Sequence, residues 1–182
     1  YTNVLVTHGH MDHASGIPYL IAMKAMLGQI PPEIYMPPSM VPPMREIMRA
    51  WEKIEDHAYQ YRFHAVKPDH EYPLEGNYFF KTFETFHRVP SNGYTVFRRK
   101  KKLKEEFHGK PQSELGRLRQ SGVEIEEHSV EAVLSFTGDT KIEYLDHCPW
   151  VAQSRVLVTE LSFIDQKRTV ENARYWGHLH LD

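Results

Sequence analysis

The sequence predicts an α/β protein in which strands and helices pack in layers. Short apolar runs rich in β-branched and aromatic residues, which are typical of strands, alternate along the chain with stretches of helical periodicity. Glycine- and proline-containing turns separate them, and we find neither an internal repeat nor a low-complexity linker. With 182 residues, the chain fits one domain or most of one, and we expect a single domain over 1–182.

The first half of the chain is expected to alternate between the two kinds of element. Val4 to Val6 predict a short buried strand, and a helix over 14–27 follows, with Gly28 as its stop. "PPEIYMPP" predicts a strand between prolines, and Ser39 is a plausible N-cap for a second helix that ends at about Asp56. Alternating polar and apolar residues predict strands over 61–67, 72–75, 77–86 and 93–99.

The second half continues the mixture. Two helices are expected over about 99–107 and 112–120, on either side of Gly109-Lys110-Pro111. "EAVLSFTGDT" predicts a strand that ends in a turn, and "RVLVTEL" predicts another buried strand. "TVENARYWG" predicts a helix capped by Thr169 and stopped by Gly177.

Composition limits the classes of function. The chain is 41% hydrophobic and 25% charged, and it has no apolar run long enough to predict a membrane span. The single cysteine, Cys148, excludes an internal disulfide and a thiolate zinc site. Low cysteine content suits a reducing compartment, so we expect a cytoplasmic location and leave an organellar targeting segment open. The net charge of −2 gives no global nucleic-acid footprint, so any RNA binding must come from local patches.

A cluster of titratable residues follows the first predicted strand. In "VLVTHGHMDHASG", three histidines and one aspartate, His8, His10, Asp12 and His13, stand within six residues. Neutral imidazole and carboxylate are ligands that suit zinc. His8 and His10 would point the same way in an extended segment, whereas Asp12 and His13 lie where the chain turns. The spacing therefore predicts a turn that serves two adjacent metal ions.

Two other predicted strand ends supply further ligand candidates. His87 stands where a strand ends before a Pro-Ser-Asn-Gly turn, and Asp139 follows a Thr-Gly turn after an apolar strand. A carboxylate at that place can bridge two cations, because it has two oxygens with several lone pairs. Taken alone, His87 would be a half-buried histidine and Asp139 a turn residue.

These motifs resemble the ribonuclease Z family of metallo-β-lactamase-fold hydrolases. The first is the HxHxDH pattern of His8 to His13; "FHRVPSNGY", "KKLKEEFHGK", "SGVEI", "LSFTGDT", "VLVTELSF" and "NARYWGHLHL" follow in the family's order. The resemblance implies a four-layer αββα fold and two zinc ions, with precursor tRNA as the substrate, a 3′-trailer endonuclease activity and a homodimer. It also implies roles for individual residues. One zinc would be held by His8, His10 and His87 and the other by Asp12 and His13, with Asp139 as the bridge, and Asp12, Glu160 and His178 would be catalytic.

The chain also departs from the family's pattern. The glycine-rich amino-terminal strands and the late histidine of the second zinc are absent, so we expect the fold to be incomplete at both ends and the second zinc to be weakly held. No long Gly-Pro-rich insertion resembles the protruding arm of many bacterial members.

A basic run has two possible interpretations. It could be a solvated helix face or a grip on tRNA phosphates; its members are Arg98, Arg99, Lys100, Lys101, Lys102 and Lys104. Two other functions stay open at this point. The same metal site could hydrolyse a small-molecule phosphodiester or sulfate ester. Alternatively, the chain could be a catalytically incomplete relative that binds tRNA, or acts as a scaffold, without cutting it.

Overall fold

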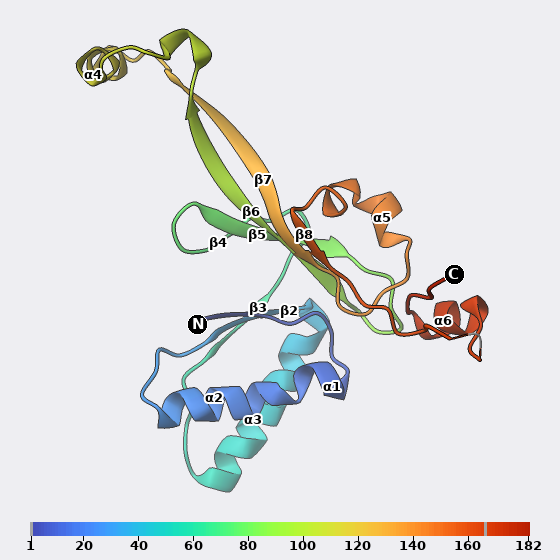
Figure 1. Ribbon diagram of the computed structural model, residues 1–182. Helices are drawn as coiled ribbons and strands as arrows, with labels where there is room; N and C mark the ends of the chain where they lie inside the picture. The colour runs from blue at the N-terminus through green and yellow to red at the C-terminus, as the bar shows by residue number, and fades with distance from the viewer. Residues whose placement is uncertain (1, 166) are drawn as a thin grey trace.

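The chain folds into two β-sheets with helices outside them (Figure 1). The computed structural model describes residues 2–165 and 167–182. The first sheet is parallel, in the order β1 (Asn3–Leu5), β2 (Glu33–Met36) and β3 (Arg62–Ala65). Its crossovers contain α1 (Met11–Ala14), α2 (Gly16–Met26), the 3₁₀ turn η1 (Pro38–Met40) and α3 (Val41–Glu55).

The second sheet is mostly antiparallel, and its order follows the sequence. It contains β4 (Tyr72–Pro73), β5 (Tyr78–Glu84), β6 (Asn92–Leu103), β7 (Glu126–Phe136) and β8 (Val156–Val158), of which only β7 and β8 pair in parallel. After β7 come α5 (Tyr144–His147) and the 3₁₀ turn η3 (Pro149–Val151), and α6 (Val170–Trp176) follows β8.

Three apolar clusters join these elements into layers. One lies between the first sheet and helices α2 and α3, and includes Ile34, Ile21 and Met48. A second lies between the two sheets, where Phe80 and Tyr94 pack against residues of the first sheet. The third packs α5 and η3 on the other side of the second sheet. The resulting order, helices, sheet, sheet, helices, confirms the predicted four-layer αββα arrangement.

The sheets are also joined by one buried hydrogen bond. The hydroxyl of Tyr94 donates to the carbonyl oxygen of Val6 at 2.6 Å. Burial raises the pKa of this phenol, so it stays protonated and remains a donor. Since Val6 lies two residues before His8, this bond ties the start of the histidine cluster to the second sheet.

Most predicted elements are confirmed, and one helix is wrong. The predicted helix over 99–107 is instead the second half of strand β6, followed by the 3₁₀ turn η2 (Glu105–Phe107). Residues 98–103 pair with 126–131 of β7, and Glu131 faces both Arg98 and Lys100. Cross-strand pairing of opposite charges overrides the helix preference of a lysine-rich run.

This pairing produces a feature that the sequence did not lead us to expect. The ends of β6 and β7 extend away from both sheets, and α4 (Gln112–Gln120) stands at their tip (Figure 1). The chain therefore has a protruding arm, although it has no long Gly-Pro-rich insertion.

Two local predictions are also wrong. Ser39 does not cap α3, because it lies inside η1 and the helix begins at Val41, with proline at its start. Proline is preorganised for a first helical turn and has no amide hydrogen to satisfy there. Strand β8 is not buried, since Val156 and Val158 are 52% and 42% exposed at the edge of the sheet. No helix in the described part of the chain is long and apolar enough to cross a membrane.

Candidate metal centre

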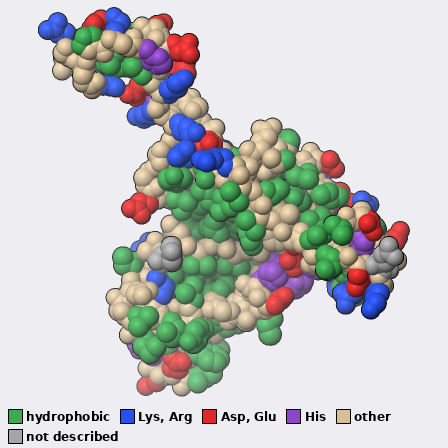
Figure 2. Space-filling view, viewed as in Figure 1, with side chains coloured by type: hydrophobic (Ala, Val, Ile, Leu, Met, Phe, Trp, Pro, Cys, Tyr) green, Lys and Arg blue, Asp and Glu red, His purple; other side chains and the backbone are tan. Residues whose placement is uncertain are grey.

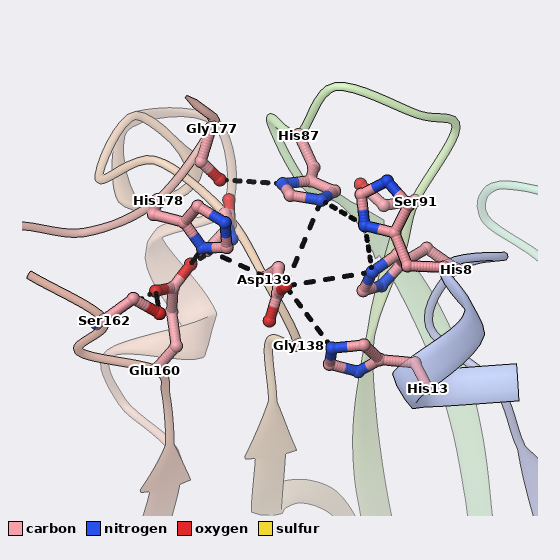
Figure 3. Close-up of polar contacts among 12 residues, drawn as sticks. His8, His13, His87, Ser91, Gly138, Asp139, Glu160, Ser162, Gly177 and His178 are labelled. Atoms are coloured by element: carbon pink, nitrogen blue, oxygen red, sulfur yellow. Dashed lines mark hydrogen bonds and ion pairs between the residues drawn. The ribbon is translucent and has the colours of Figure 1, made fainter. Parts of the chain in front are cut away.

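The candidate ligands meet at one edge of the two sheets, although they are far apart in the sequence (Figure 3). His8 and His10 follow strand β1, and His13 lies on α1. His87 follows β5 and Asp139 follows β7. The strand ends thus bring together the predicted groups from the first and second sheets.

Three imidazole nitrogens and one carboxylate oxygen form a compact donor set. His10 Nδ1 lies 3.2 Å from His8 Nε2 and 3.1 Å from His87 Nε2. Asp139 Oδ2 lies 3.8 Å from the first and 4.0 Å from the second of these Nε2 atoms. Ligands bound tetrahedrally to one zinc at about 2.0–2.1 Å are separated by roughly 3.3 Å, so this donor set fits a zinc ion.

Burial favours the neutral imidazole, which is the form in which histidine binds a metal. His8 is fully buried, and its pKa falls to about 3, first because burial disfavours the charged ring and then because of His13, His87 and His10 nearby. Burial also lowers the pKa of His87, although the carbonyl of Gly177 and the Asp139 carboxylate oppose this shift.

Two rings of the candidate donor set, those of His8 and His87, have a polar neighbour at their second nitrogen. Thr7 Oγ1 lies 3.1 Å from His8 Nδ1, and the carbonyl oxygen of Gly177 accepts a hydrogen bond from His87 Nδ1 at 2.8 Å. Both partners restrain the orientation of the ring, and the Gly177 carbonyl, which can only accept, leaves Nε2 of His87 unprotonated. The sequence did not predict Thr7 as a residue of the site. Its position directly before His8 is the feature of the sequence that could have indicated this role.

Asp139 lies at the centre of the site. Its Oδ2 is 3.4 Å from His13 Nε2 and 3.9 Å from His178 Nδ1, in addition to its contacts with His8 and His87. The turn that carries it depends on Gly138, which has a φ of 63° and whose added Cβ would lie 2.7 Å from Thr7 Cβ. A side chain at Gly138 would therefore push Asp139 away from the segment after β1 that carries Thr7 and His8.

A second donor group shares this carboxylate. Asp139, Glu160 and His178 offer ligand atoms within 4.8 Å of one another. His178 Nδ1 lies 2.9 Å from Glu160 Oε1. The same Glu160 oxygen accepts a hydrogen bond from the Thr140 amide at 2.8 Å, and the other oxygen accepts one from the Ser162 hydroxyl at 2.6 Å. Glu160 is thus held in place from several sides.

Two of the candidate ligands, Asp12 and His13, belong to neither donor group among the described residues. The side chain of Asp12 is 80% exposed, and its Oδ2 lies 3.4 Å from His13 Nε2. His180 is close to His178 in the sequence but does not join the site. Its Nε2 donates to the Arg168 carbonyl oxygen at 2.8 Å, and its Nδ1 accepts a hydrogen bond from the Asp182 amide at 3.1 Å.

The basic run lies on the arm and is partly neutralised. Arg98 and Lys100 both contact Glu131, at 2.8 and 2.7 Å, and Arg99 pairs with Glu71. Lys101, Lys102 and Lys104 have no ion pair within the described segments. A single positive face is not formed, because successive side chains of a strand alternate between its two sides.

Comparison with known proteins decides the family. The chain is 33% identical over 128 residues to the nuclear ribonuclease Z of Triticum aestivum, and the alignment covers 67% of this chain and 69% of that protein. The chain belongs to the ribonuclease Z family. It is also 31% identical over 180 residues to tRNase Z TRZ1 of Arabidopsis thaliana and 30% identical over 183 residues to the chloroplastic tRNase Z TRZ2 of the same plant.

These alignments cover 98% of this chain, but 64% of TRZ1 and 51% of TRZ2, so the chain spans between half and two thirds of those two ribonuclease Z proteins. No family model matches the sequence. Among solved structures, the metallo-β-lactamase fold protein YhfI from Bacillus subtilis matches with a TM-score of 0.58 at 16% identity, covering 98% of this chain and 56% of that one. This likeness confirms the metallo-β-lactamase fold.

The lowered pKa of His8 predicts how the metal-free ribonuclease Z chain responds to acid. The folded-state pKa of about 3 lies below the ordinary 6.5, so protons favour the unfolded chain. Stability should be complete above about pH 6.5 and should fall as the pH drops from there toward 3. Urea unfolding of the chelator-treated protein between pH 8 and 5 measures this loss, and His8→Gln should make the dependence shallower. A slope that His8→Gln leaves unchanged would assign the acid sensitivity to other groups.

Proposed function

We propose that the protein is a zinc-dependent endoribonuclease that removes the 3′ trailer from precursor tRNA. The observation that carries this proposal is the donor set of His8, His10, His87 and Asp139 beside the His178–Glu160 pair, in a chain of the ribonuclease Z family. In this proposal the second zinc is held by Asp12 and His13, and Asp139 is shared. Zinc bound at this site would acidify water and neutralise charge on the scissile phosphate.

Asp12 is proposed to prepare the attacking water. Its exposed carboxylate stands at the rim of the site beside His13, where solvent and substrate can reach it. A carboxylate at such a place can orient water and accept its proton.

His178 is proposed to protonate the leaving 3′-oxygen. Glu160 accepts a hydrogen bond from His178 Nδ1, so Nε2 is the ring atom that can present a proton to substrate. An imidazole can carry a proton on either ring nitrogen and can pass it to a substrate oxygen. The contacts of Glu160 with Thr140 and Ser162 restrain the direction in which the ring points.

The arm is proposed to bind the body of the tRNA, at a distance from the bond that is cut. Within the basic run 98–104, Lys101, Lys102 and Lys104 are the residues without an ion pair in the part of the chain that the structure describes, so they can contact phosphates without first breaking a pair. Arg98, Arg99 and Lys100 help to hold the arm to its neighbouring strands and can contribute charge from there.

We also propose that two chains form a homodimer through helices α2 and α3. Their outer faces carry Tyr19, Met26, Trp51 and Ile54, which are 46% to 73% exposed, and the first three of these line a cavity of about 510 Å³. Figure 2 shows hydrophobic side chains gathered over this part of the molecule. Contiguous exposed apolar side chains are typical of protein interfaces, and a second copy offers the same patch in return.

His178→Ala tests the proposed function directly. The ribose 3′-oxygen is a poor leaving group that needs a proton, whereas p-nitrophenolate leaves without help. The variant should lose about 10²–10⁴-fold in rate on precursor tRNA, much less on bis-p-nitrophenyl phosphate, and no zinc. His10→Ala should lose both activities together with zinc, which mass spectrometry measures. Equal losses on both substrates for His178→Ala, together with lost zinc, would make His178 a ligand. Wild-type turnover of the ester without cleavage of precursor tRNA would favour a small-molecule hydrolase.

Replacing Lys101 and Lys102 by glutamine tests the arm. Each lost phosphate contact should reduce the slope of log K against log salt by about one unit for tRNA binding. Turnover of bis-p-nitrophenyl phosphate should stay near wild type, because the ester is too small to reach the arm. Lys53→Gln, on the exposed side of α3, serves as the matched control. An unchanged slope in the arm variant would show that these lysines are solvated and do not contact tRNA phosphates.

Trp51→Glu tests the dimer. A charge buried in an apolar interface without a partner is strongly unfavourable, so the variant should sediment as a monomer at concentrations where wild type is dimeric. Val130→Glu, on the arm strand and 58% exposed, is the control and should leave the dimer intact. A monomeric wild-type protein at high micromolar concentration would contradict the proposal.

A further inference from the structure

We propose that Gly177 is a positioning residue that orients the metal ligand His87 and seats the turn carrying His178. Its carbonyl would set the tautomer of His87, and its lack of a side chain would let the turn pack directly on the His87 backbone. This inference rests on the proposed metal site, and goes beyond it by assigning a role to a residue outside the ligand and proton-transfer sets.

The first observation is the hydrogen bond between the two residues. The Gly177 carbonyl oxygen lies 2.8 Å from His87 Nδ1 (Figure 3). A carbonyl can only accept, so Nδ1 must carry the proton. His87 Nε2 then keeps its lone pair, and this is the atom that faces His10 Nδ1 at 3.1 Å and Asp139 Oδ2 at 4.0 Å. The side chain of His87 is only 1% exposed, so water cannot readily replace the carbonyl as partner.

The second observation is the closeness of the two backbones. A Cβ added to Gly177 would lie 2.9 Å from His87 Nδ1, 3.0 Å from His87 Cα and 3.2 Å from the Arg88 amide nitrogen. Two of these three atoms belong to the backbone, which cannot move aside as the end of a flexible side chain can. A methyl group at residue 177 would therefore push the turn away from His87 and lengthen the hydrogen bond.

The residues before and after Gly177 also contact residues 87 and 88. The guanidinium of Arg88 lies 4.3 Å from the centre of the Trp176 ring, in a cation–π contact. The rings of His87 and His178 have centroids 5.0 Å apart. Three successive residues, 176 to 178, thus rest on residues 87 and 88. The distance of His178 from the candidate zinc site is set by the same packing that orients His87.

Gly177 also has a simpler role, the termination of α6, and the test must distinguish the two. Gly177 ends α6 with a φ of 79°, a conformation that glycine adopts without strain. Gly122 provides the matched control, since it follows α4 with a φ of 80°, and a Cβ added there would meet nothing within 4 Å. Alanine at either position meets the same backbone strain, but only at residue 177 does it meet His87.

The experiment compares Gly177→Ala with Gly122→Ala by three measurements. Urea unfolding of the metal-free proteins should show a lower midpoint for both variants because of the shared backbone strain, and the lower of the two for Gly177→Ala, which also displaces its turn. Zinc affinity, measured by competition with a chromophoric chelator, should fall about 10- to 100-fold for Gly177→Ala, as when a ligand loses its outer partner, and stay within about twofold of wild type for Gly122→Ala. Imidazole ¹⁵N shifts of the metal-free wild type should show His87 protonated on Nδ1. Equal zinc affinities in the two variants, or a His87 protonated on Nε2, would overturn the inference.

A second pair of variants covers the case in which Gly177→Ala does not fold. Trp176→Leu removes the ring under Arg88, and Tyr175→Leu removes a neighbouring ring that is 72% exposed. Only Trp176→Leu should weaken zinc binding, and equal binding in both would overturn the inference. None of these measurements uses RNA, so a wild type that binds zinc but does not cut precursor tRNA would refute the proposed function and leave the role of Gly177 standing. A wild type without zinc affinity would refute the metal site and this inference together.

Discussion

The site depends on one carboxylate oxygen that lies among four imidazoles. Asp139 Oδ2 is 3.4 to 4.0 Å from nitrogens of His8, His13, His87 and His178. Rings crowded in this way would repel one another if they were protonated, and burial keeps His8 neutral far below its ordinary pKa. A carboxylate at the centre and the neutral ring of His8 beside it are donors that a divalent cation can bind.

The two sheets serve this arrangement by bringing together turns from distant parts of the sequence. The parallel sheet presents the turn after β1, and the second sheet presents the turns after β5 and β7. The Tyr94–Val6 hydrogen bond and the apolar cluster around Phe80 set the relative position of the sheets. Where these turns approach one another most closely, the residue is a glycine, because a Cβ would not fit. Gly138 packs against Thr7 in this way, and Gly177 packs against His87.

The arm is built on a different principle. Leu115 and Ile125 are buried at its tip, but residues 98–103 and 126–131 are not, and ladder hydrogen bonds and cross-strand charge pairs such as Lys100 with Glu131 hold these strands together. An extension of this kind can carry charge far from the sheets without changing the packing around the metal centre. Binding of a large substrate and chemistry at the site can therefore be separated in this fold.

The sequence alone determined the elements whose causes are local and the ligands grouped by a motif. Thr169 and Gly177 bound α6 as expected, and His8, His10 and His13 stand together because they are neighbours in the chain. His87 and Asp139 could be proposed from their strand-end turns, but only the pairing of β5 and β7 with β6 in the second sheet brings them within 4.0 Å of each other. The arm escaped prediction because a lysine-rich run has no strand pattern by itself, and only its pairing with residues 126–131 makes it one. The contact between Gly177 and His87, 90 residues apart, was likewise decided by tertiary structure, since a glycine that ends a helix looks the same in sequence whether or not another backbone rests on it.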